Sequence, residues 1–293
     1  MSMEHSGETL LYSLSTSEDG SLLAGASEDG SVKLYRLDKE GPTLLQSLSF
    51  HKAAVFDLVF YQQRIISASY DGTLAFWKRD TLDYVFERSI PVFQGAINTI
   101  CMSGDQIVCG CSDGKIRVIS LEGDVLKEVV GHRHGVTGVS AWKEYIVSGG
   151  MDGAAKVWSK DLSLLKEIKD HSGAIRDCRA APSPYSSLVF ATCGEDGLAY
   201  VYTQKNKIGK SEDKDESKDK DESKEEGSEE KEEVSEGSEL VFGKDKLDLG
   251  ERCAKVSWSK SGYALSIGYG TGKAKVFLPN GPTGWKESQV VLP

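Results

Sequence analysis

Three sets of histidine, hydroxyl and carboxylate side chains could carry out acyl transfer if each set were held in one site. They are His51, Ser67 and Asp71; His132, Ser148 and Asp152; and His171, Thr192 and Asp196. A catalytic set occurs once in a chain, whereas a set that returns at regular intervals belongs to a repeated structural unit. We therefore interpret all three sets as structural, and we expect no catalytic residue and no enzymatic activity.

Other motifs that could bind a ligand are weak. The glycine-rich stretch GYGTGKAKV (268–276) lacks the spacing of a phosphate-binding loop and has Ala274 where that loop needs a hydroxyl. The six cysteines form no C-x-x-C pair, and most lie inside strand-like runs. We expect buried free thiols in a reducing compartment, and neither a metal nor a cofactor.

The elements that position the three sets repeat along the chain. The stretch ISASYDGTLAFW (66–77) predicts a β-hairpin, because two strand-like runs flank an Asp-Gly turn. Related stretches are EDGSVKLY (28–35), SDGKIRVI (112–119), MDGAAKVW (151–158), EDGLAYVY (195–202) and GTGKAKVF (270–277). Equivalent positions are mostly 39 to 44 residues apart, a period typical of β-propeller blades.

The three repeats that carry these sets also end on an aromatic residue, at Trp77, Trp158 and Tyr202. Together with the three sets above, this pattern resembles the WD-repeat family, in which such side chains form a hydrogen-bonded tetrad within a blade. A buried polar group is costly unless it is paired, so a closed network would fix the turn. The resemblance predicts three structural tetrads, namely His51/Ser67/Asp71/Trp77, His132/Ser148/Asp152/Trp158 and His171/Thr192/Asp196/Tyr202.

Each repeat divides into four strand-like runs, which predicts an all-β WD-repeat propeller of six four-stranded blades as a single domain over residues 1–293. Only nine residues precede the first inner strand, and the last repeat supplies its own outer strand. We therefore expect an open ring that lacks an N-terminal closing strand. Its unpaired edges could be covered by β-strand addition from a partner.

The acidic excess of the chain is local. Residues 210–239 contain 15 acidic residues and 6 lysines, against 45 acidic and 35 basic residues in the whole chain. Such a segment cannot bury enough apolar surface to fold, so we predict a disordered acidic insertion at 205–239, between the third and fourth strands of blade five. The remainder is almost neutral, which argues against direct binding of nucleic acid.

Three stretches resemble one branch of the WD-repeat family in particular, the Sec-thirteen type. They are HSGAIRDCRAAPSPYSSLVFATCGEDGLAYVYT (171–203), CAKVSWSKSGYALSIGYGTGKAKVF (253–277) and GPTGWKESQVV (281–291), and a thinner likeness extends over nearly the whole chain. Proteins of this type are structural subunits of the outer COPII coat, which acts in ER-to-Golgi transport, and of the nuclear pore Y-complex. The resemblance implies a helical scaffold partner, the coat rod subunit or a nucleoporin, that donates a seventh blade.

The resemblance also implies contact edges for that partner, at Leu10, Leu11, Tyr12 and Leu14 in the first blade and Val256, Trp258, Leu265 and Ile267 in the sixth. It implies a cytoplasmic protein that is peripheral to the endoplasmic reticulum and COPII vesicles through the coat, or located at the nuclear pore. No small-molecule substrate is implied. Two alternatives stay open: a Seh-one-type nuclear pore subunit, and a peptide-binding WD-repeat adaptor.

Overall fold

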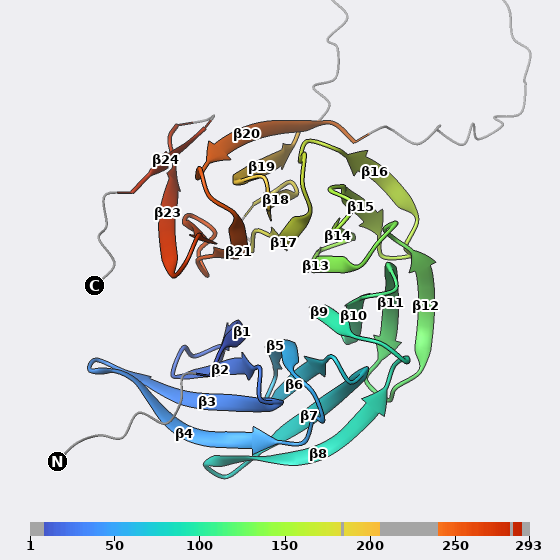
Figure 1. Cartoon of the computed structure of the whole chain (residues 1–293), viewed down its shortest axis with the longest axis vertical. Coiled ribbons are helices and arrows are strands. Elements are labelled where there is room, and N and C mark those ends of the chain that lie inside the picture. The colour runs from blue at the N-terminus through green and yellow to red at the C-terminus, as the bar shows by residue number, and fades with distance from the viewer. Residues whose placement is uncertain (1–8, 183–184, 206–239, 282–283, 289–293) are drawn as a thin grey trace, which may run out of the picture.

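The computed structural model describes residues 9–182, 185–205, 240–281 and 284–288. All the elements within these residues are β-strands, and they form six antiparallel four-stranded sheets. The sheets follow one another around a common axis as the blades of a propeller (Figure 1). The predicted all-β propeller of six four-stranded blades is therefore confirmed.

Each blade runs from an inner strand at the axis to an outer strand at the rim. Blades one to three contain β1 (Leu11–Thr16), β2 (Leu22–Ser27), β3 (Ser31–Asp38) and β4 (Gly41–Ser49); β5 (Val55–Tyr61), β6 (Arg64–Ser69), β7 (Thr73–Asp80) and β8 (Asp83–Pro91); and β9 (Ile97–Ser103), β10 (Gln106–Cys111), β11 (Lys115–Ser120) and β12 (Val125–Val130). Blades four to six contain β13 (Val136–Trp142), β14 (Tyr145–Gly150), β15 (Ala155–Ser159) and β16 (Leu164–Ile168); β17 (Ile175–Ala180), β18 (Val189–Gly194), β19 (Leu198–Gln204) and β20 (Phe242–Asp248); and β21 (Cys253–Trp258), β22 (Leu265–Tyr269), β23 (Lys273–Pro279) and β24 (Trp285–Glu287).

A tight Asp-Gly turn joins the second and third strands of a blade. In blade two, Oδ1 of Asp71 accepts the backbone N–H of Thr73 at 3.0 Å. Gly72 has a φ of 81°, and a Cβ at this residue would lie 2.2 Å from the carbonyl oxygen of Phe93 in the following loop. Glycine is needed here for two reasons, the left-handed backbone and the close approach of another segment.

All six inner strands share an irregularity in their pairing with the second strand, close to the start of the inner strand. We call the residue that follows this irregularity the axis position of the blade. The six axis positions are Ser13, Asp57, Thr99, Gly138, Asp177 and Lys255. The shared irregularity matters because a bulge of this kind redirects side chains locally.

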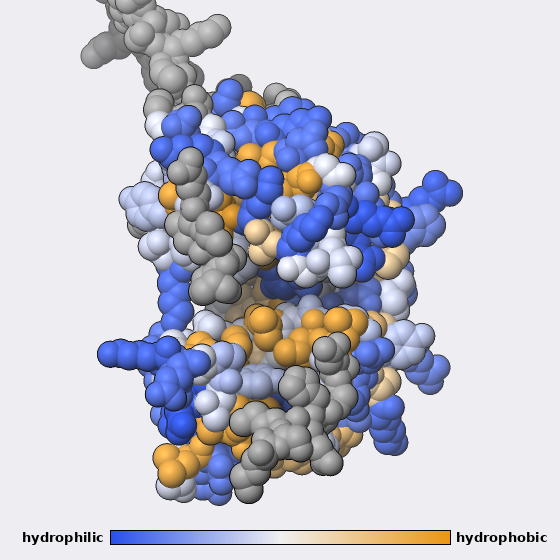
Figure 2. Space-filling model, turned by 60° about the vertical axis from the view of Figure 1, so that its left-hand side comes forward, coloured by the Kyte–Doolittle hydropathy of each residue, from blue (hydrophilic) through white to orange (hydrophobic). Residues whose placement is uncertain are grey.

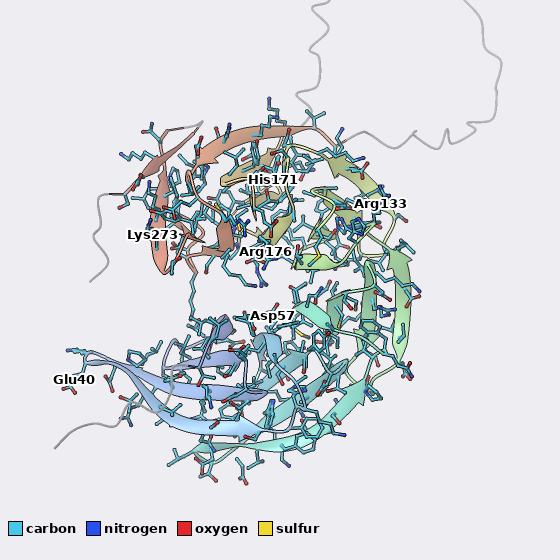
Figure 3. All side chains as sticks on the ribbon, in the orientation of Figure 1. Glu40, Asp57, Arg133, His171, Arg176 and Lys273 are labelled. Atoms are coloured by element: carbon cyan, nitrogen blue, oxygen red, sulfur yellow. The ribbon has the colours of Figure 1, made fainter. Side chains whose placement is uncertain are left out.

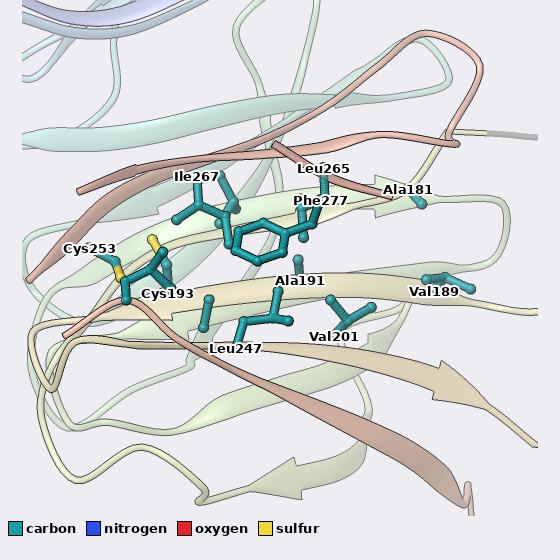
Figure 4. Close-up of a cluster of buried hydrophobic side chains, with 13 residues drawn as sticks. Ala181, Val189, Ala191, Cys193, Val201, Leu247, Cys253, Leu265, Ile267 and Phe277 are labelled. Carbon is teal, nitrogen blue, oxygen red and sulfur yellow. The ribbon is translucent and has the colours of Figure 1, made fainter. Parts of the chain in front are cut away.

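Neighbouring blades pack through five hydrophobic clusters, one at each junction from blade one to blade six. We call the face that a blade turns to the next blade its back face, and the face turned to the preceding blade its front face. At the last junction, Ala191 and Val201 on the back face of blade five contact Leu265, Ile267 and Phe277 on the front face of blade six (Figure 4). Side chains alternate along a strand, so every blade has two faces to cover.

Strands β19 and β20 pair over their whole length in blade five. The predicted acidic insertion falls between them, and residues 206–239 lie outside the described residues. The insertion and its disorder therefore stay a prediction.

Replacing Gly72 with alanine should destabilise the fold far more than the same change at Gly104. Both residues have positive φ, but a Cβ at Gly104 would meet nothing within 4 Å. G104A should therefore cost only the left-handed backbone strain, about 1–2 kcal/mol, whereas G72A adds a clash with backbone. Urea denaturation of both variants measures the difference, and equal midpoints would contradict the turn geometry.

Candidate functional site: the gap between blades one and six

The structure brings the four side chains of the predicted tetrad in blade two into contact. Nε2 of His51 lies 2.8 Å from Oγ of Ser67, and Nδ1 lies 3.3 Å from Oδ2 of Asp71. Nε1 of Trp77 donates a hydrogen bond to the same Ser67 hydroxyl at 3.0 Å. The same contacts recur in blade four, at 2.8–2.9 Å, among His132, Ser148, Asp152 and Trp158.

The set in blade five differs in its aromatic member. His171 contacts Thr192 at 2.9 Å and both carboxylate oxygens of Asp196 at 3.0 Å. The hydroxyl of Tyr202, however, donates to Oδ2 of Asp170 at 3.2 Å. A phenol carries its polar atom at the far end of the ring, so it reaches a partner that an indole N–H would not.

These sets have the environment of structural networks. Ser67, Ser148 and Thr192 are completely buried, so no substrate reaches their hydroxyls. Burial lowers the pKa of His51 and His132, and the neighbouring aspartates only partly oppose this effect. Among the residues that the structure describes, no group of three or more potential metal ligands is present, and no helix is long and apolar enough to cross a membrane.

Blade three replaces the tetrad with an arginine, which the sequence reading missed. Phe93 and Cys109 stand where blade two has its histidine and serine. Arg117 binds Asp113 through two N–H groups at 2.6 and 3.1 Å, pairs with Glu128 at 2.7 Å, and lies 4.4 Å from the centre of the Phe93 ring. This buried arginine fixes the same turn by different chemistry.

The axis of the ring carries a polar network that joins distant blades. Arg179 of blade five lies 3.3 Å from Oδ2 of Asp57 in blade two and 3.2 Å from Oδ1 of Asp177. Both carboxylates are at most 1% exposed, and Asp57 lies at the inner edge of the ring (Figure 3). Burial alone would raise the pKa of Asp57, but Arg179, Lys255 and hydrogen bonds from other residues hold it below its usual value.

Within the residues that the structure describes, the ring is open between blade six and blade one. Extended contacts join the inner strands in the order β1, β5, β9, β13, β17 and β21, and none of comparable extent joins β21 to β1. A cavity of about 740 Å³ lies at the inner end of this gap, around the axis, and is lined by residues of the inner strands β1, β5, β9, β17 and β21 and by Lys260 in the turn after β21. Figure 2 shows the hollow, with apolar side chains gathered along its lower, blade-one side.

The blade-six wall of the gap is a back face without a neighbour. In the other five blades, the four back-face positions of the second and third strands are all buried, as with Ile66, Ala68, Leu74 and Phe76 in blade two. The equivalent residues of blade six are Ser266, Gly268, Ala274 and Val276, and none of them is buried. The register of β22 and β23 puts all four on the face opposite Leu265 and Phe277.

The blade-one wall is a front face without a neighbour. Leu10 and Leu14 are 55% and 57% exposed. Leu11 and Leu14 lie over Gly25, since a Cβ at that glycine would meet both side chains within 3.4 Å. Exposed leucines beside a cavity are typical of a surface that packs against another chain.

Of the eight edge residues that the family resemblance implies, the structure places some at the gap and others away from it. Leu11, Tyr12, Leu14, Val256 and Trp258 line the cavity at the gap, and Leu10 is exposed just before β1. Leu265 and Ile267 are completely buried against blade five and do not line it. Val256 is 3% exposed and belongs to the same cluster. Tyr12 also packs edge-on against Phe56 of blade two, and Trp258 donates to the carbonyl of Arg179 at 3.0 Å. Leu265 and Ile267 lie away from the gap because side chains alternate along β22, and the apolar face of this strand already packs on blade five.

One side chain bridges the mouth of the gap. The ammonium of Lys260, in the turn between β21 and β22, donates to the backbone carbonyls of Ser17 at 3.0 Å and Glu18 at 2.7 Å. Sequence reasoning gave no sign of this contact, because its partners are backbone atoms at the other end of the chain.

The profile of the family "WD domain, G-beta repeat" matches residues 2–36, 42–78, 123–159 and 162–203, which is more than half of the chain. The chain belongs to the WD40-repeat family. The profile leaves out most of blade three, where the arginine network replaces the tetrad, and all of blade six.

More distant similarity is found to curated proteins. The chain is 24% identical over 136 residues to "Protein transport protein sec13" of Aspergillus oryzae, covering 40% of this chain and 46% of that protein. It is 23% identical over 133 residues to the protein of the same name from Coccidioides immitis, covering 40% and 43%. An F-box/WD-40 repeat-containing protein of Arabidopsis thaliana is 28% identical over 134 residues, covering 39% and 24%. The matches thus span less than half the length of these relatives, and less of this chain than the near-complete likeness that the sequence suggested.

Stability should fall as the pH falls from about 6.5, the ordinary pKa of histidine, toward the lower pKa values of folded His51 and His132. Over this range the unfolded chain binds protons that the folded chain does not. His132→Asn should weaken this pH dependence, and His134→Asn, at an exposed residue, should leave it unchanged. Urea midpoints at about pH 7 and about pH 5.5 test this, and identical pH profiles for the two variants would contradict it.

Arg179→Met should destabilise the fold by roughly 3–5 kcal/mol, because Asp57 and Asp177 would remain buried without their shared cation. The matched control is Arg176→Met on the same strand, where the arginine is exposed and pairs with Glu195 at 3.6 Å. The control should change stability by about 0.5 kcal/mol or less. Similar losses of stability in the two variants, measured by urea unfolding, would show that the Arg179 network stabilises the fold no more than an exposed ion pair does.

Proposed function

We propose that this chain is a non-enzymatic scaffold subunit that takes part in protein transport. It is of the Sec13 type, which is written Sec-thirteen above. Its mechanism is burial and main-chain pairing: a partner inserts a β-segment between blades one and six and completes the ring. The partner is a helical scaffold protein of a vesicle coat, and the inserted segment acts as the seventh blade.

The observation that carries the proposal is the pair of unfilled blade faces. Five junctions in the ring are sealed by apolar clusters, and the same positions at the sixth junction are open, with leucines exposed on one side. A space between two uncovered sheet faces is suited to another sheet, because sheets stack about 10 Å apart and the strands of a sheet present alternating side chains to both neighbours.

The names of the fungal relatives, which are protein transport proteins, support a role in protein transport. A role in a vesicle coat would place the chain in the cytoplasm, peripheral to the endoplasmic reticulum and its vesicles. A role at the nuclear pore, and the alternative of a Seh-one-type subunit, rest only on the resemblance carried by residues 171–203, 253–277 and 281–291.

One specific observation favours a second candidate, a peptide-binding adaptor. An F-box/WD-40 repeat-containing protein is among the relatives. An adaptor of this kind presents ligands on a closed ring, however, and the gap makes the scaffold the better-supported function.

The test blocks the gap without touching the core. Gly268→Leu adds a side chain on the open face of blade six, where a Cβ would meet only the carbonyl oxygen of Lys255 at 3.9 Å. Thr203→Leu, at an exposed strand residue of blade five, is the matched control. Each tagged variant is purified from its own cells in mild salt, and the bound proteins are identified and quantified.

We expect the wild-type chain and T203L to retain one stoichiometric helical-repeat protein with a β-rich segment, together with coat components. G268L should lose it at least tenfold while its unfolding midpoint stays near wild type. Recovery of ubiquitin-ligase or signalling proteins without such a partner, or equal recovery by G268L, would overturn the proposal.

A further inference from the structure

The axis positions of neighbouring blades contact one another. Oγ of Ser13 in blade one donates to Oδ1 of Asp57 in blade two at 2.7 Å, and Oγ1 of Thr99 in blade three donates to Oδ2 of the same carboxylate at 3.0 Å. A donor at one axis position is therefore within hydrogen-bond distance of an acceptor at the next.

The side-chain oxygen at an axis position also binds the backbone of the following blade. Asp57 accepts the N–H of Ile100 at 3.0 Å, and Asp177 accepts the N–H of Val256 at 3.2 Å. Thr99 does the same for Val139 at 3.3 Å, so this contact recurs at three of the five filled junctions. The axis positions thus couple consecutive blades.

Blade six breaks this pattern at the gap. Its axis position is Lys255, which can donate hydrogen bonds but cannot accept them. The Lys255 side chain lines the gap cavity, and its ammonium forms no hydrogen bond or ion pair with any residue that the structure describes. In the open ring water can solvate it.

An inserted blade would cover Lys255 and remove that water. A buried ammonium needs an acceptor, and an isolated buried charge is very costly. Asp57 cannot serve, because its two oxygens already receive Ser13, Thr99, Arg179 and the N–H groups of Leu58 and Ile100. Asp177 of blade five already receives the N–H groups of Cys178 and Val256 and pairs with Arg179, and it forms no hydrogen bond or ion pair with Lys255. The inserted segment is therefore the remaining source of an acceptor for Lys255.

The blade-six wall adds a second requirement. Its four gap-facing residues are Ser266, Gly268, Ala274 and Val276, whereas the equivalent wall of blade two has Ile66, Ala68, Leu74 and Phe76. A segment that fills the space to the density of a protein interior has to bring bulky apolar side chains to this wall.

We propose that the gap takes a β-blade of a partner protein whose axis position is an aspartate or glutamate that pairs with Lys255, and whose bulky apolar side chains pack on the small wall of blade six. This inference rests on the proposed function and specifies the chemistry of the partner. Blade two of the chain itself has both features, with Asp57 at its axis position and Ile65 and Trp77 on its front face.

The experiment uses that blade as the probe. A copy of residues 51–91 is joined after residue 293 through a flexible linker, with either its native aspartate or the change Asp57→Asn in the copy only. Each version is appended to the wild-type chain and to a chain with Lys255→Met, and we call these chains the hosts. A chain with Lys273→Met, changed at an exposed lysine of blade six, is the control host. The readout is the thermal unfolding midpoint at low protein concentration.

We expect the appended copy to raise the unfolding midpoint above that of the chain without it. The aspartate copy should exceed the asparagine copy by at least about 3 °C in the wild-type and K273M hosts, and this difference should vanish in the K255M host. If the copy stabilises the chain but aspartate and asparagine are equal in every host, the acidic-partner inference is wrong and blade insertion stands. If no copy stabilises the chain, the gap does not accept a blade, and the proposed mechanism fails as well.

Discussion

A propeller blade is a sheet with two apolar faces, and each face has to be covered. In this chain the back face of each of the first five blades lies on the front face of the next, and residues such as Phe76 and Val201 are completely buried as a result. Covering one large aliphatic side chain contributes about 1.5–3 kcal/mol. The front face of blade one and the back face of blade six are the two faces that no neighbouring blade covers.

Polar contacts link the parts of the ring that lie on either side of the gap. At the axis, Arg179 connects blade five to Asp57 in blade two. At the mouth, Lys260 connects blade six to the turn after β1. A binding site whose walls are already in place loses less conformational entropy when it is occupied, so these contacts favour insertion of a segment over rearrangement of the ring.

The repeat made much of the fold predictable from the sequence. Asp-Gly turns at a period near 40 residues predicted the hairpins, and the histidines at matching offsets predicted which side chains meet around Ser67 and Ser148. These contacts lie within one blade, so short-range spacing is enough to find them. The partner of Tyr202 could not be predicted, because it depends on the reach of the phenol rather than on spacing.

The walls of the gap were harder to predict, and the physical reason is strand alternation. The sequence shows that Leu265 and Ile267 share a face, but not that this face lies on blade five. The residues that face the gap, Ser266 and Gly268, are small or polar and carry no apolar signal. The Arg179–Asp57 pair spans 122 residues, and no local pattern links its members.

Amide hydrogen exchange of the purified chain, alone and bound to its partner, tests the open ring most directly. Blades one and six are each supported on one side only, so we expect amides of β2 and β22 to exchange at least tenfold faster in the free chain than in the complex. Amides of β10, inside the ring, should change little. Equal protection of β2, β10 and β22 in the free chain, with no slowing on binding, would show that the ring is closed and would contradict insertion into the gap.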